Sequence, residues 1–413
     1  MAKNISKEMS PKTGALSGIK ILDLSRTLPG PFCTMILADL GAEVIKIQEA
    51  HRRRNPLETL IPKSELTTED LKQGYTPHRS IDRNKKGLAL DLKTAEARSV
   101  FYKLAEKSDV VVVEYRPKVS MRLGIDYETL KKVNPRLIYC AITAYGQDGP
   151  YADFPAHDAN IIATAGILGI TGTPEGRHVL PGVPLADLCG GGMNAAVGIL
   201  SALLARARTG KGQFIDISML DGAVAMLLAR HGMLYGVTGD SPKLGQRPSH
   251  VYQTKDGKYL CFAGGEPWFW ERLCRALGLE ELIPFDQVVR PFSPFSEKRE
   301  EVTARLRDTF LTKTRDEWLE ILHKADTCVA PVHTTMEEVL NDPQVQHRRM
   351  MVEVDDPLFG VVRQPGVAIK FSETPGRVRT FSPRHGQHTV EILSELGYRE
   401  EEIAKLKKNG AVV

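Results

Sequence analysis

Short apolar runs alternate with helix-like segments along the first half of the chain. From Ile19 to Gln48 the pattern predicts a strand (IKILDLS), a turn (PGP), a helix (FCTMILADLG) that stops at Gly41, and a second strand (AEVIKIQ). This order is a βαβ unit, which implies a parallel sheet. The runs KGLALDL, DVVVVEY and RLIYCAITAYG predict three further strands by residue 146. The pattern therefore predicts a doubly wound α/β domain.

The residue pattern changes in the second half of the chain. A helix is predicted over Met193–Arg208, and the TGKGQ that follows it reads as a helix C-cap turn, because a phosphate loop would precede its helix. FIDISML predicts another strand and DGAVAMLLARHGML another helix. After about Gly236 aromatic and proline-containing pieces indicate a smaller second domain, and the last residues predict a closing helix pair.

Composition narrows the class of protein. The chain has 413 residues, 42% hydrophobic and 26% charged, with a net charge of +4, which does not favour a nucleic-acid partner. Its purely apolar runs are shorter than the roughly 20 residues of a membrane helix, and the N-terminus is polar. Six scattered cysteines without a CxxC pair predict reduced thiols and no zinc site. We expect a cytoplasmic protein with no membrane and no metal.

One carboxylate has an unusual setting. Asp187 lies in PLADLCGGGMNAAVGIL, among small and apolar residues and ahead of a predicted helix. It could be a helix N-cap, a position that Asp favours. Alternatively, the glycines Gly190–Gly192 leave backbone amides uncovered, so that a ligand could approach closely or an oxyanion could be stabilised. In that interpretation, Asp187 is a nucleophile or base.

Other candidates are individually weaker. His157 in FPAHDAN has Asp158 beside it, and such an acid could orient an imidazole. The first βα turn, SRTLPGP, is not GxGxxG, so a dinucleotide cofactor is disfavoured. Five basic residues near the ends of the predicted strands are candidates for binding a phosphate-rich ligand: Arg83, Lys85, Lys86, Arg116 and Arg122.

The chain resembles the family III CoA-transferases, whose superfamily includes the α-methylacyl-CoA racemases. The resemblance rests on LDLSRTLPGPFCTMILADLGAEVIKI, RNKKGLALDLKT, DVVVVEYRPKVSMRLGIDYETLKKVNPRLIYCAITAYGQDGP, LADLCGGGMNAAVGILSALLARARTGKGQFIDISMLDG and GVAIKFSETPG. It implies a large α/β domain built from both chain ends, an inserted smaller α+β domain and an interlocked dimer. We expect 1–225 and 341–413 to form the large CoA-binding domain and 226–340 the small one.

The resemblance also implies site residues. Asp187 matches the nucleophilic aspartate of the transferases, which attacks an acyl-CoA thioester and forms a mixed anhydride. Coenzyme A is then a substrate, and no cofactor is tightly bound. For CoA binding, the resemblance and the uncovered glycine amides together give five residues: Asn84, Lys85, Arg116, Arg122 and Gly191.

The superfamily leaves a second reaction open. His157, Asp187 and Glu266 match the residues with which racemases exchange the α-proton of an acyl-CoA. The length of the chain and GVVRQPGVAIKFSETPG favour a transferase, which acts on an acyl-CoA and a carboxylic acid. A heterodimer with a paralogous subunit is an alternative to a homodimer. Gln48 and Glu49 stand where many members carry Arg, with Arg52–Arg54 slightly later.

The acyl group cannot be read from the sequence. Trp268, Phe269 and Trp270 could line an acyl pocket or form the core of the small domain, and the second is favoured. His157 and Arg247 could bind a second carboxylate, and AGGEP is a short version of the loop that shields the transferase intermediates.

Overall fold

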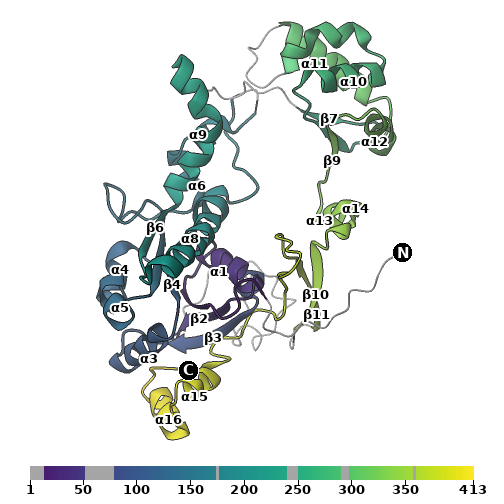
Figure 1. The fold of residues 1–413 in the computed structure, drawn as a ribbon. Coiled ribbons are helices and arrows are strands. Elements are labelled where there is room, and N and C mark those ends of the chain that lie inside the picture. The colour runs from purple at the N-terminus through teal and green to yellow at the C-terminus, as the bar shows by residue number, and fades with distance from the viewer. Residues whose placement is uncertain (1–13, 52–78, 174–175, 240–249, 290–296, 357–359) are drawn as a thin grey trace. The chain divides into compact units, whose positions relative to one another are not determined.

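The computed structural model describes residues 14–51, 79–173, 176–239, 250–289, 297–356 and 360–413 (Figure 1). Contacts divide the chain into two compact units. The first holds residues up to Ala165, Gly182–Leu227 and Arg349–Val413, and the second holds Gly166–Pro181 and Leu228–Arg348. The breaks before Leu228 and before Arg349 fall near the expected domain boundaries at 226 and 341. The domain assignment itself stays a prediction. The assignment of Gly166–Pro181 to the second unit had no signal in the sequence.

The first unit is built on a six-stranded sheet in the order β3-β2-β1-β4-β5-β6, with every neighbouring pair parallel. The predicted parallel α/β sheet is therefore confirmed. Each predicted strand is present: β1 (Lys20–Leu24), β2 (Glu43–Glu49), β3 (Lys85–Leu90), β4 (Val110–Val113), β5 (Ile138–Thr143) and β6 (Phe214–Ser218).

Helices cover both faces of this sheet, as a doubly wound fold requires. One face carries α3 (Ala95–Glu106), α5 (Tyr127–Val133) and the C-terminal α15 (Thr389–Glu395) and α16 (Glu400–Lys408), whose apolar residues form one core with the strands. The other face carries α1 (Pro29–Asp39) and α8 (Asn194–Thr209), which contact each other and the strands.

Local sequence explains where several of these elements begin and end. Helix α1 has Pro29 in its first turn, where a missing N–H costs nothing. Gly41, where the helix is expected to end, has a backbone φ of 109°, and Gly210, the C-cap of α8, has a φ of 73°. Both values lie in the left-handed region that glycine adopts without strain. The TGKGQ segment is thus a helix C-cap, as predicted.

The chain end returns to the first unit. Val412 bridges Leu90 at the end of β3, and α15 packs against β3. The remaining elements of this unit are η2 (Arg79–Asp82), α4 (Pro117–Leu123), α6 (Asp158–Thr164), η3 (Ala186–Met193), the hairpin β10 (Met351–Asp356) with β11 (Gly360–Pro365), and the start of α9 (Met219–Thr238).

The second unit has its own core. A three-stranded antiparallel sheet packs with helices around Trp270 and Phe310, and the Trp270 indole donates to Leu282 O. Trp270 is therefore a core residue, in agreement with the favoured interpretation of the aromatic cluster, whereas Trp268 is 56% exposed. The elements are α7 (Ile167–Ile170), β7 (Val251–Gln253), β8 (Tyr259–Phe262), α10 (Pro267–Leu277), η4 (Glu280–Val289), α11 (Glu297–Phe310), α12 (Arg315–Lys324), β9 (Val329–Val332), α13 (Met336–Asn341) and α14 (Pro343–His347).

The helix formed by η3 and α8 begins earlier than predicted. It runs from Ala186 to Thr209 and is long and apolar enough, by length and composition alone, to span a membrane. The helix contains polar residues such as Asp187 and Asn194, so the expectation about purely apolar runs is unaffected. The core helix of a globular protein meets the same criterion, and η3 packs against α1 as such a helix does.

Candidate active site

A pocket of about 190 Å³ lies in the first unit beside the carboxyl ends of β1 and β4. The strand order places these strands side by side, although their following loops lead to opposite faces of the sheet. Ligands of doubly wound proteins bind at such a switch point. The pocket is lined by residues of the β1–α1 loop, the start of α1, the β4–α4 loop, the end of β5 and the segment after it, η3 and α9: Thr27, Pro29, Glu114, Tyr115, Arg116, Ile142, Thr143, Ala144, Ala152, Phe154, Ala156, His157, Asp187 and Met219.

Asp187 lies in this pocket and belongs to the first turn of η3. It is not the N-cap, so that alternative is wrong. Asp158, at the start of α6, supplies the acceptor instead: its Oδ1 accepts the backbone N–H groups of Ala186 at 2.7 Å and Asp187 at 3.1 Å. A carboxylate from a distant segment thereby fixes the start of the helix that carries Asp187.

The electrostatic setting of Asp187 is unusual for an aspartate. Burial, and secondly the negative charge of Asp158, raise the pKa of Asp187 to about 6. No lysine or arginine among the described residues forms an ion pair with it. Asp187 is thus a carboxylate of raised basicity that is still ionised near neutral pH.

The three glycines after Asp187 serve helix packing. A Cβ at Gly190 would lie 2.7 Å from Met219 O, one at Gly191 would lie 2.8 Å from Pro29 Cβ, and one at Gly192 would lie 2.8 Å from Phe32 Cδ1. All three are buried in a π-helix, whose wider turn is frequent at functional sites. Residues of α1 and α9 thus pack against these glycines, and the expectation that their amides face a ligand, Gly191 included, stays a prediction.

His157 also lines the pocket, so the structure brings it together with Asp187. It is exposed and precedes α6, with its backbone N–H donating to Asn160 Oδ1 at 3.2 Å. The expectation that Asp158 orients this imidazole is wrong, because the hydrogen bonds of Asp158 go to the η3 backbone.

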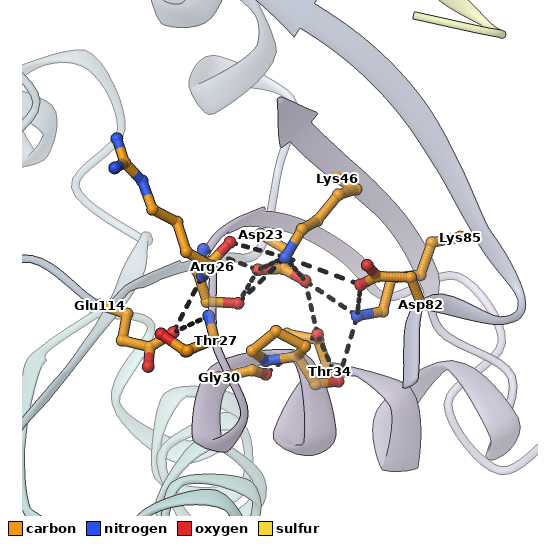
Figure 2. A network of polar contacts seen from close by, with 11 residues as sticks. Asp23, Arg26, Thr27, Gly30, Thr34, Lys46, Asp82, Lys85 and Glu114 are labelled. Atoms are coloured by element: carbon orange, nitrogen blue, oxygen red, sulfur yellow. Dashed lines mark hydrogen bonds and ion pairs between the residues drawn. The ribbon is translucent and has the colours of Figure 1, made fainter. Parts of the chain in front are cut away.

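A polar network lies beneath the pocket at the end of β1 (Figure 2). Asp23, which is fully buried, accepts from Thr34 Oγ1 at 2.6 Å, Lys85 Nζ at 3.0 Å and Lys46 Nζ at 3.3 Å. Burial alone would raise the pKa of Asp23, but the two lysines and the hydroxyl groups hold it well below its usual range. Asp82 adds a second acceptor for Lys85, at 2.8 Å. The network ties β1 to β2, β3 and α1.

Two of the expected CoA-binding residues are occupied within the protein. Lys85 is buried on Asp23 and Asp82. Asn84, with a φ of 61°, donates to Asp39 Oδ1 at 2.7 Å and accepts from the Arg379 backbone N–H at 2.6 Å. The Lys85 ammonium also donates to Pro31 O, and the Asn84 amide also donates to Arg377 O of the C-terminal segment, so their expected ligand role is corrected to a structural one.

Arg83 is occupied in the same way. Its guanidinium is buried and donates to Asp39 Oδ2 at 2.6 Å. Lys86 pairs with Glu391 of α15 at 2.6 Å. Arg83, Lys85 and Lys86 therefore attach the sheet to neighbouring segments instead of facing a phosphate.

The two arginines of the β4–α4 region differ from these. Arg116 lines the pocket and Arg122 lies in the last turn of α4, both exposed. Neither guanidinium forms an ion pair or hydrogen bond with another of the described residues.

Glu266 belongs to the second unit, where it lies within AGGEP immediately before α10, and its side chain is exposed. Arg52–Arg54 and Arg247 lie outside the described residues.

Sequence reasoning missed Glu114 and the capping role of Asp158. Glu114 follows the buried strand β4 directly, and its Oε2 accepts the backbone N–H groups of Arg26 at 2.9 Å and Thr27 at 3.2 Å. Burial raises the pKa of Glu114, although those two hydrogen bonds oppose the rise. A polar residue at the carboxyl end of a buried strand was the signal that could have singled it out.

Comparison with known proteins completes the assignment. The model of CoA-transferase family III matches residues 16–389. This chain belongs to CoA-transferase family III. Among its relatives is the succinyl-CoA:glutarate CoA-transferase of Mus musculus, 34% identical over 96% of this chain and 90% of the relative. The human alpha-methylacyl-CoA racemase is 32% identical over 96% of this chain and 97% of the relative.

A solved structure supports the same assignment. The crystal structure of a CAIB/BAIF family protein from Brucella suis matches with a TM-score of 0.79 and 31% identity, over 93% of this chain and all of that one. The protein is therefore an enzyme of the family III CoA-transferases, and acyl-CoA is its class of substrate. Family III contains both transferases and racemases, so membership alone does not decide between the two reactions.

Proposed function

We propose that this enzyme moves CoA from an acyl-CoA thioester to a free carboxylic acid, with Asp187 as the covalent nucleophile. The observation that carries the proposal is the setting of Asp187: a half-buried carboxylate in a pocket at the switch point, with a pKa of about 6 and without a cationic partner among the described residues. A carboxylate without a cation keeps its electron pair available for attack.

The reaction runs in four attacks. Asp187 attacks the thioester carbonyl, the C–S bond breaks, and a mixed anhydride and CoA thiolate form. The thiolate attacks the Asp187 carbonyl of the anhydride and releases the first acid as its carboxylate, which leaves an aspartyl-CoA thioester. The acceptor carboxylate attacks that thioester and expels the thiolate, which then attacks the acceptor acyl carbon. The new acyl-CoA leaves and the Asp187 carboxylate is restored.

Two features of the site support this chemistry. Fixing the start of η3 through Asp158 holds the nucleophile in place, which reduces the entropy cost of each attack. Partial burial limits access of water, which would hydrolyse the anhydride.

The first backbone N–H groups of η3 do not serve as oxyanion donors. Those of Ala186 and Asp187 donate to Asp158, and that of Leu188 donates to Pro184 O.

Arg116 and Arg122 are the candidates for the CoA phosphates. Both are exposed and without a partner among the described residues, and guanidinium groups bind phosphate oxygens bidentately. The name of the mouse relative supports a dicarboxylic donor or acceptor. Succinate and glutarate are the first acids to screen.

The test is a trapping experiment. The enzyme is incubated with succinyl-CoA, treated with hydroxylamine or borohydride, and digested for mass spectrometry. A hydroxamate or an alcohol at Asp187 is the expected result. An unmodified Asp187, in an enzyme that still exchanges CoA between acids, would exclude the covalent mechanism.

Racemisation is the second candidate, and it rests on the presence of His157 in the same pocket as Asp187. Two bases can exchange the C2 proton of a 2-methylacyl-CoA, one removing it and the other returning one to the opposite face. Solvent deuterium would then enter C2 without an adduct at Asp187. His157→Ala would abolish racemisation, whereas it would only weaken CoA transfer.

We also propose that the enzyme is a dimer. Met193, Val197 and Leu204 project from one side of η3 and α8 and are 47%, 62% and 70% exposed. A second subunit would remove this apolar surface from water. Light scattering of the purified protein tests the assembly, and a monomer at micromolar concentration would exclude a stable dimer.

A further inference from the structure

Glu114 connects the two loops of the switch point. It ends β4, while the amides that it accepts belong to Arg26 and Thr27 in the loop after β1. Both loops line the reactive pocket, through Thr27 and Pro29 on one side and Arg116 on the other. The carboxylate therefore links the two loops at the switch point.

Only one oxygen of Glu114 is used for this connection. Oε2 accepts both amides, and Oε1 has no hydrogen-bond partner among the described residues (Figure 2). Gly30 leaves room for the group, because a Cβ there would lie 3.2 Å from Oε2. Since Glu114 lines the pocket, its second oxygen is an acceptor available to a substrate.

We propose that Glu114 is a positioning residue, whose Oε1 accepts the N–H of the CoA amide nearest the sulfur and so places the thioester against Asp187. This proposal rests on the proposed function. The amide N–H is the donor closest to the reacting carbon in every acyl-CoA, whatever the acyl group. The pocket holds both Asp187 and this unused carboxylate oxygen, so a donor N–H next to the thioester has an acceptor in the same pocket as the nucleophile.

Glu114→Gln separates the two roles of this side chain. The amide oxygen of Gln can still accept from Arg26 and Thr27, while an NH₂ donor replaces Oε1. The matched probe is a CoA analogue in which CH₂ replaces that N–H. Dissociation constants of CoA and of the analogue are measured by calorimetry for the wild type, for Glu114→Gln and for the control Glu106→Gln, an exposed carboxylate on α3.

The expected result is a preference of the wild type and of Glu106→Gln for CoA over the analogue by about 10- to 100-fold, which Glu114→Gln loses. Equal weakening of both ligands in Glu114→Gln would mean a loop anchor only and would overturn the proposal, as would an unchanged preference. A wild type that binds neither ligand would instead contradict the proposed function. Thermal melting of Glu114→Gln shows whether the variant is folded.

Discussion

Asp23 and Asp187 are two aspartates of one structural unit with opposite surroundings. Asp23 is completely buried, yet Lys46 and Lys85 keep it ionised and hold its pKa well below the usual range. Asp187 is only half-buried, but its nearest charge is another carboxylate and its pKa rises to about 6. The partner, rather than the depth of burial, decides whether a carboxylate is committed to structure or available for chemistry.

The largest expected effect is on activity at Asp187. Asp187→Ala and Asp187→Asn should each lower kcat/KM for CoA transfer by at least about 10³-fold, because Asp187 is the proposed nucleophile, whereas Glu114, the other carboxylate that lines the pocket, is held by the backbone amides of Arg26 and Thr27. Steady-state transfer between two acids measures this effect. Appreciable activity in either variant, with an unchanged melting temperature, would show that the nucleophile lies elsewhere.

The corresponding change at Asp23 should affect stability. Asp23→Asn leaves the ammonium groups of Lys46 and Lys85 buried with less compensation, and we expect a loss of about 3–5 kcal/mol in the free energy of unfolding. Urea unfolding followed by circular dichroism measures it. Asp187→Asn is the matched control and should not lower stability, because it removes a charge whose burial opposes folding. Similar losses of stability in both variants would contradict the idea that Asp23 is a structural carboxylate and Asp187 is not.

The pKa values also predict opposite pH effects of the two groups on stability. The folded-state pKa of Asp23 lies below its unfolded value, so its stabilisation is present above the usual Asp range and is lost as the pH falls below it. The raised pKa of Asp187 means that its ionisation opposes folding: the cost grows as the pH rises from the ordinary value of 3.8 to about 6, is complete above about 6, and disappears on acidification below the ordinary value.

The acid limb of activity should report Asp187. Attack requires the carboxylate, so kcat/KM should fall as the pH drops through about 6, with roughly a tenfold loss at about pH 5. A pH profile of the free enzyme measures the limb. A limb near pH 4 would mean that Asp187 has an ordinary pKa in solution.

Asp158→Asn should have a smaller effect on the same profile. The asparagine oxygen can still accept the amides of Ala186 and Asp187, but the negative charge is gone. We expect the acid limb to move to lower pH by less than about 2 units, because burial still raises the pKa of Asp187. An unmoved limb would mean that burial alone sets this pKa.

Local patterns in the sequence were sufficient for the architecture of the first unit. The apolar strands, the helix after PGP and the glycines at its end and at Gly210 predict the order of elements, because side-chain periodicity and left-handed turns depend on neighbours in the chain. Resemblance of longer segments was sufficient for the family, and it drew attention to Asp187, which the structure places in the pocket with His157.

The roles of individual polar residues depended on contacts that no local pattern contains. Lys85 and Asn84 have the residue types of a CoA-binding site, but Asp23, Asp39 and the returning C-terminal segment bury them. Gly191 has the residue type of an open loop, but Pro29 and Met219 lie against it.

Chemical type, spacing and periodicity are properties of the chain itself, so the sequence alone determined the family, the strand order along the chain and the candidate nucleophile. Burial and charge pairing are sums over residues far apart in the sequence. Only the tertiary structure could therefore decide that Asp158 caps the helix of Asp187, that Glu114 joins the loops at the switch point, and that Asp23 and Asp187 have opposite pKa shifts.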